Sequence, residues 1–190
     1  GIGNPAEFNK STIRVREGDR ISRNAFLHKL VTSLYSRTTA EFQRGNFRVT
    51  GDNVDIFLAY ADFAYRVTFF GDEVEEIQSI DPITGKGFEK HDSVAIFPAN
   101  IFVTDPQTQL EAIFKIQEDM VAQVEYFRSV GQMLEAKRLE ERVTYDLEMM
   151  RELGYCSGIE NYSRYFDNRQ PGERPFCLLD YFPDDYLMVI

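Results

Sequence analysis

The chain has 190 residues, of which 43% are hydrophobic and 27% charged, and its formal net charge is −10, values typical of a globular rather than a disordered protein. No apolar run approaches the ~20 residues that a membrane span needs. Two cysteines, Cys156 and Cys177, cannot form a disulfide framework, and His28 and His91 lie in unrelated contexts, which excludes a Cys/His zinc site. We therefore expect a cytoplasmic, reduced protein with no metal site and no membrane segment.

Positive charge gathers at the start of the chain. Residues 1–50 carry nine Lys or Arg against four Asp or Glu, and residues 51–190 carry twelve against twenty-seven. Seven of the first nine are arginines, which pair with carboxylates or phosphates through two parallel N–H groups. This region is either a solvated basic face or a docking surface for an acidic partner, protein or nucleic acid.

The first half of the chain predicts one helix and four or five antiparallel strands. Ser22 is a suitable N-cap, and apolar residues follow it at helical spacing: Ala25, Phe26, Leu30, Val31 and Leu34. Strands are expected at 46–50, 53–57, 65–70, 74–80 and 94–97, with a tight turn at Gly51-Asp52. Alternation along these strands places Arg48 and Arg66 on the outer face of the sheet.

The second half predicts helices and a final strand. From Pro106 to Leu153 apolar residues keep helical spacing, interrupted at Gly131, and Gly154 is a natural helix end. The sequence Ser157-Gly158-Ile159-Glu160 matches a capping box that opens a short helix. The run from 186 to 190 suits a strand buried on both faces. Because a native end seldom falls inside such a run, we expect a fragment of a longer protein.

Catalytic motifs are missing from the sequence. It contains no phosphate-binding G-x-x-x-x-G-K-[ST] loop, no G-x-S-x-G elbow and no H-E-x-x-H helix. Asp184 and Asp185 are more typical of a cap and a turn than of metal ligands, and Cys156 is more typical of a small buried hydrophobe than of a reactive thiol. We expect no active site in this chain.

The second half also carries a specific family resemblance. Segments 134–142, 145–152 and 154–164, followed by 178–185, closely resemble the UvrB family, the B subunits of bacterial excinuclease ABC. Segments 44–49, 69–73 and 94–99 fit as well, so the resemblance covers the chain. The transcription-repair coupling factor has a related module, and a DNA-binding fragment of such a factor is the alternative.

The resemblance implies an α+β fold in three parts. Residues 1–102 would be a small antiparallel sheet with a helix, like UvrB domain 2 with its leading linker. Residues 103–163 would be a helical segment like domain 1b, and residues 164–190 a piece of the ATPase domain 1a with its terminal strand.

The resemblance also implies a function. The chain would be a fragment of the DNA damage-recognition subunit of nucleotide excision repair, docking UvrA through domain 2, with damaged DNA and UvrC as further partners of the full-length protein. ATP and magnesium would serve the full-length protein. The fragment lacks the Walker A and Walker B motifs, so it would hold no cofactor and would not be an enzyme.

Three arginines match the UvrA-docking positions of the family. Domain 2 uses surface arginines against acidic groups of UvrA, and the matching residues here are Arg37, Arg48 and Arg66. The chain departs from the family at Thr50 and Thr68, where relatives carry Arg and Glu. The docking surface would therefore be smaller, or its charge pairs rearranged.

Two further residues match positions near the family's DNA path, namely Arg142 and Glu160. The capping box gives Glu160 a structural role that needs no DNA. Residues 101–190 carry nine Lys or Arg against seventeen Asp or Glu, so the fragment alone is expected to bind DNA weakly.

Overall fold

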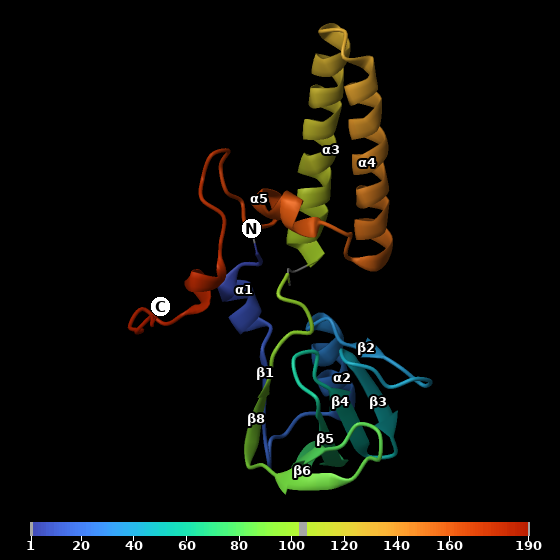
Figure 1. The fold of residues 1–190 in the computed structure, drawn as a ribbon. Coiled ribbons are helices and arrows are strands. Elements are labelled where there is room, and N and C mark those ends of the chain that lie inside the picture. Colours follow the sequence, from blue (N-terminus) through green and yellow to red (C-terminus); the bar gives the residue numbers. More distant parts are fainter. Residues whose placement is uncertain (1, 103–105, 190) are drawn as a thin grey trace. The chain divides into compact units, whose positions relative to one another are not determined.

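The computed structural model describes residues 2–102 and 106–189, and the chain divides into two compact units (Figure 1). Residues 6–102 form one, here called the sheet unit. Residues 2–5 and 106–189 form the other, here called the helical unit. Within the described residues, no helix is both long and apolar enough to cross a membrane.

The sheet unit follows the predicted α+β pattern (Figure 1). Its helices are α1 (Pro5–Lys10), all but the first residue of which belong to this unit, and α2 (Arg23–Thr32). Its strands are β1 (Ile13–Arg16), β2 (Ser36–Arg37), β3 (Asn46–Thr50), β4 (Asn53–Phe57), β5 (Ala64–Phe70), β6 (Glu73–Ile80), β7 (Gly87–Lys90) and β8 (Ser93–Ile96). Strands β2 to β7 form one six-stranded sheet in chain order, antiparallel except for the parallel β2–β3 pair. The predicted strands are thus confirmed, and the Gly51-Asp52 turn joins β3 to β4.

Strands β1, β2 and β7 were not predicted. Strand β1 pairs with β8 in a separate two-stranded ribbon, with Ile13 opposite Ile96. This pairing joins segments about 80 residues apart, so no local spacing indicates it. All four residues of β7 are exposed, so the strand shows no apolar alternation.

One face of the six-stranded sheet packs against α2. Ser22 caps this helix as predicted, because its hydroxyl accepts a hydrogen bond from the Ala25 amide at 3.2 Å. Phe26 and Leu30 are buried in a core shared with apolar residues of the sheet and of β1 and β8. The wider stripe predicted for α2 is wrong, since Val31 and Leu34 are exposed. The helix ends at Thr32, and Leu34 has a φ of 67°, so it does not continue the helical face.

The helical unit is dominated by a hairpin of two helices, α3 (Pro106–Ser129) and α4 (Met133–Leu153) (Figure 1). Gly131 lies in the turn between them, and Gly154 ends α4 in the left-handed conformation as predicted. The contact face is narrower than predicted. It holds Ala112, Ile113, Ile116 and Val124 of α3 with Ala136, Val143, Leu147 and Met150 of α4. Other residues of the expected stripe are exposed, among them Leu110, Phe114, Val121, Leu134 and Leu153.

Two predictions for the helical unit are wrong. The short helix exists as η1 (Ile159–Tyr162) followed by α5 (Ser163–Phe166), but its N-cap is Gly158, with no side-chain cap bond. The capping box at 157–160 is therefore absent. The expected terminal strand is also absent from 186–189, which follow η2 (Leu178–Tyr181) as irregular backbone. A strand needs a neighbouring strand for its backbone hydrogen bonds, and the described part of this unit holds only helices and loops.

The burial pattern predicts which isoleucine matters for stability. Ile77 is fully buried in the sheet core, whereas Ile83 is 92% exposed. We expect Ile77→Ala to lower the free energy of unfolding by about 2–5 kcal/mol through lost burial and a cavity. Ile83→Ala, the matched control, should change it by less than about 0.5 kcal/mol. Urea unfolding followed by circular dichroism tests this; equal effects would contradict the assigned core.

Candidate functional site

A row of polar side chains crosses the face of the sheet opposite the core. The strand register aligns Arg48 of β3, Asp55 of β4, Arg66 of β5 and Gln78 of β6, and Lys90 of β7 continues the line. Arg48, Asp55, Arg66 and Gln78 are each next in sequence to a buried apolar residue of the core. Because successive side chains of a strand point to opposite faces, the row projects from the outer face. The predicted outward placement of Arg48 and Arg66 is confirmed.

Asp55 connects the two arginines. It is only 3% exposed, and its carboxylate accepts hydrogen bonds from both neighbours. The Arg48 Nε donates to Oδ2 at 3.1 Å, while Arg66 donates through Nε to Oδ1 at 2.6 Å and through Nη2 to Oδ2 at 2.8 Å. A buried carboxylate is costly unless it is paired, so these contacts hold the arginines in place.

The two guanidinium groups are held differently. Arg66 also donates from Nη1 to the Gly85 carbonyl at 3.3 Å, and the hydrogen bonds to Asp55 raise its pKa. Arg48 lies with its guanidinium carbon 4.3 Å from the centre of the Phe42 ring, an arrangement that favours a cation. Its side chain remains 33% exposed. Arg66 is therefore fixed on several sides, whereas Arg48 keeps an open edge.

Arg37 is not part of this cluster. It lies in the two-residue edge strand β2, exposed, in register with Phe47, which belongs to the core face. The two threonines that the resemblance singles out lie on the sheet itself. Thr50 is exposed at the end of β3, and the Thr68 hydroxyl donates to Asn53 Oδ1 at 2.8 Å.

In the helical unit, Asp146 is a buried carboxylate that accepts hydrogen bonds from neighbouring side chains, as Asp55 does in the sheet unit. It is 2% exposed on α4, and its Oδ2 accepts from Arg142 Nε at 2.9 Å and from the Tyr162 hydroxyl at 2.7 Å. Its other oxygen has no hydrogen-bond partner among the described residues. Arg142 also donates to the Ser157 carbonyl at 3.1 Å, so this group ties the 157–162 segment to α4.

Glu160 lies on that tied segment and is exposed. The hydrogen bond from Arg142 to Ser157 places the segment that carries Glu160 beside the middle of α4, where Arg142 lies. Without the capping box, the helix start gives Glu160 no structural role. Their contact with DNA stays a prediction.

Cys156 is buried beside the same group. Burial raises the pKa of its thiol to about 11, and the neighbouring Asp146 carboxylate acts in the same direction. A thiol of this kind is protonated at neutral pH and is a poor nucleophile. The prediction that Cys156 is a small buried hydrophobe is confirmed.

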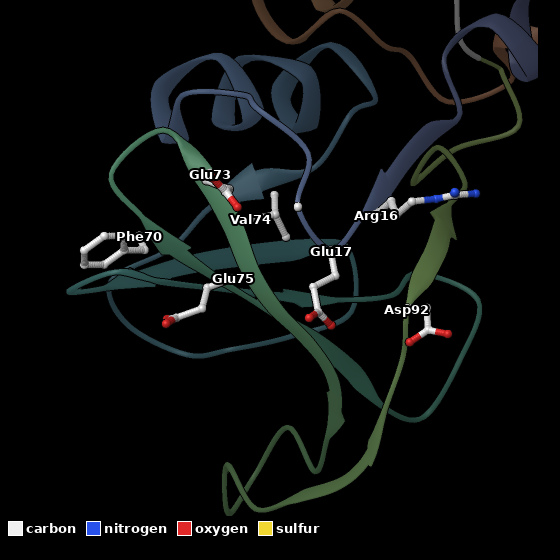
Figure 2. A pocket seen from close by; sticks show the side chains of 8 residues that line it. Arg16, Glu17, Phe70, Glu73, Val74, Glu75 and Asp92 are labelled. Carbon is white, nitrogen blue, oxygen red and sulfur yellow. The ribbon is translucent and has the colours of Figure 1, made fainter.

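A hollow of about 510 Å³ lies on the sheet unit near the β5–β6 turn (Figure 2). Its lining includes the exposed ring of Phe70 and four carboxylates: Glu17, Glu73, Glu75 and Asp92. Figure 2 shows the side chain of Arg16 extending away from Glu17. The four carboxylates of this hollow would repel a phosphate group. In the described part of the chain, no three His, Cys, Asp or Glu side chains lie close enough together to hold a metal ion.

Comparisons with known proteins agree with this architecture. The model of the UvrB interaction domain matches residues 13–102, and that of the UvrB third helical domain matches residues 107–168. UvrABC system protein B of Cytophaga hutchinsonii and of Bacteroides thetaiotaomicron are 57% and 56% identical over the whole chain. That of Enterococcus faecalis is 50% identical. The chain spans 28–29% of the length of these relatives. The matches do not favour the coupling-factor alternative.

The contacts of Asp55 predict unequal effects of the two arginines on stability. Arg66→Ala removes two of its three hydrogen bonds and should lower the free energy of unfolding by about 3 kcal/mol. Arg48→Ala removes one and should cost about 1.5 kcal/mol. Arg44→Ala, which breaks an exposed pair with Asp62, should cost less than about 1 kcal/mol. Urea titration measures all three, and equal losses for Arg66 and Arg48 would refute this ranking.

The two cysteines should differ in reactivity. Because the pKa of Cys156 is about 11, only about one thiol in a thousand is ionised at about pH 8, and the group is buried. We expect iodoacetamide to modify the half-buried Cys177 first, and Cys156 at a comparable rate only in denaturant. Mass spectrometry of timed samples gives both rates; equal rates in the folded protein would contradict the burial of Cys156.

Proposed function

The chain belongs to the UvrB family, and we propose that its sheet unit docks UvrA through the outer face that carries Arg48 and Arg66. The observation that carries the proposal is the pair of partly exposed arginines fixed side by side on the outer sheet face by one buried carboxylate. A guanidinium group that is already fixed in place is suited to an acidic partner. Its side-chain entropy is lost on folding, so binding does not incur that cost again.

Two further observations support this assignment. The match to the UvrB interaction domain covers residues 13–102, which include every strand of the sheet unit. Most of the basic first fifty residues lie within that match: residues 1–50 carry nine Lys or Arg against four Asp or Glu, while residues 51–190 carry twelve against twenty-seven. An acidic protein surface would thus meet residues 1–50 more favourably than any other region of similar length.

The activity of the whole protein is also a proposal for this chain, which is less than a third as long as its relatives. We assign ATP-dependent damage verification on DNA, with ATP, magnesium and UvrC, to a longer cytoplasmic protein. The sequence described here has no phosphate-binding loop of its own, and we propose that it neither holds ATP nor hydrolyses it.

For the helical unit we propose a position beside the DNA path, with Arg142 and Glu160 nearest to it. The support is their exposure and the hydrogen bond from Arg142 to Ser157, which holds the segment that carries Glu160 against α4. Seventeen acidic residues over 101–190 oppose phosphate binding, so this contact would depend on the rest of the protein.

The docking proposal is tested by titrating the chain against purified UvrA, with duplex DNA in parallel. We expect saturable binding to UvrA and little binding to DNA. Arg48→Ala should weaken the UvrA complex at least about 30-fold, since truncating one member of an interfacial charge pair costs about 2 kcal/mol or more.

A charge-matched control separates a specific contact from general attraction. Arg14→Ala removes the same charge from an exposed position on β1, outside the six-stranded sheet, and should weaken binding by less than about threefold. Equal losses for the two variants would refute the assigned face. Binding to DNA without binding to UvrA would refute the docking function.

A further inference from the structure

We propose that Phe42 and Asp55 hold the Arg48 guanidinium as a fixed receptor for one carboxylate of the partner, which approaches its two terminal nitrogens end-on. The inference rests on the proposed docking of UvrA and names the chemistry of the central contact. Phe42 and Asp55 act through Arg48, so they are positioning residues.

The first step concerns which edge of Arg48 remains open. A guanidinium can bind a carboxylate bidentately either along its Nε side or at its end, through Nη1 and Nη2. Asp55 occupies the Nε side at 3.1 Å. Among residues 2–102 and 106–189, no acceptor is paired with Nη1 or Nη2 of Arg48. The end of the group is thus a complete, unused pair of donors.

The second step concerns the plane of the group. The Phe42 ring lies under the guanidinium, with the carbon 4.3 Å from the ring centre. Phe42 is itself held by Phe57, whose ring centre is 5.6 Å away. One face of the guanidinium is thereby covered, and rotation about its long stem is restricted. An incoming carboxylate must approach in the plane of the group, as the bidentate geometry requires.

The third step distinguishes Arg48 from Arg66. Arg66 spends Nε and Nη2 on Asp55 and Nη1 on the Gly85 carbonyl. Arg66 thus uses three of its five N–H groups and is 22% exposed, whereas Arg48 uses one and is 33% exposed, so Arg48 is the better placed of the two to receive a second carboxylate. In charge, Asp55 neutralises one arginine of the two, so the cluster carries one net positive charge. That balance suits a single carboxylate placed at Arg48.

The test is a set of titrations of the full chain against UvrA. Phe42→Leu keeps an apolar side chain but removes the aromatic face, and it should weaken binding about tenfold. Phe42→Tyr restores the ring and should remain within about twofold of the unchanged protein. In the Arg48→Ala background, Phe42→Leu should have no further effect, because its role is to hold Arg48.

A second variant does not depend on the packing of Phe42. Arg48→Lys keeps the charge but replaces the planar fork by a single ammonium, so it should weaken binding nearly as much as Arg48→Ala. Phe88→Leu is the matched aromatic control, since Phe88 is 61% exposed on β7 away from Arg48, and it should leave affinity unchanged. Circular dichroism checks that each variant is folded.

The outcomes separate this inference from the docking function. If the unchanged chain binds UvrA and either Phe42→Leu or Arg48→Lys binds equally well, the fixed receptor is wrong while the docking function stands. Additive losses for Phe42 and Arg48 would also overturn it, since Phe42 would then act on its own. If the unchanged chain does not bind UvrA, both proposals fail.

Discussion

The sheet unit is organised around one buried carboxylate that cannot be left unpaired. In the sequence of β4, Asp55 lies between Val54 and Ile56, and its side chain points to the opposite face of the sheet from theirs. Only 3% of Asp55 is exposed to solvent. Its charge requires donors from both neighbouring strands, and Arg48 and Arg66 supply them. The need to satisfy Asp55 therefore fixes where the arginines lie, and through them the charge pattern of the open face.

The same solution recurs in the helical unit with different backbone geometry. Asp146 on α4 is also buried, and it accepts hydrogen bonds from Arg142, one helical turn earlier, and from Tyr162 in the segment that follows α4. In both units a buried acid organises an arginine that the family resemblance singles out. The difference is in what remains exposed: an open guanidinium edge on the sheet, and a tied loop bearing Glu160 beside α4.

Much of the fold could be predicted because its signals are local. Strand alternation and the Gly51-Asp52 turn gave β3 and β4, and Ser22 gave the start of α2. The β1–β8 pairing could not be predicted, because it depends on contacts far apart in the chain. The capping box failed for a local reason, since Gly158 adopts a φ of 81° and takes the cap position that the pattern assigned to Ser157.

The candidate site was predicted in part, and a further signal was present in the sequence. A two-residue turn fixes hairpin register, so Arg48 must face Asp55 across β3 and β4. Because Asp55 alternates with the apolar Val54 and Ile56, it is expected on the outer face together with the arginine opposite it. Arg66 of the next strand is in register with Asp55 and extends the same row. The role of Phe42 had no such signal, because it lies in an irregular segment whose path depends on the packing of its ring against Phe57.

The edges of the six-stranded sheet limit how any partner can be recognised. One edge is β2, only two residues long, and the other is β7, fully exposed and bearing Glu89 and Lys90, with an irregular register against β6. Short or charged edges resist the addition of a foreign strand. Recognition by main-chain pairing is thereby disfavoured, and side chains on the face must carry it. A docking surface of this kind can be changed one side chain at a time without disturbing the backbone that presents those side chains.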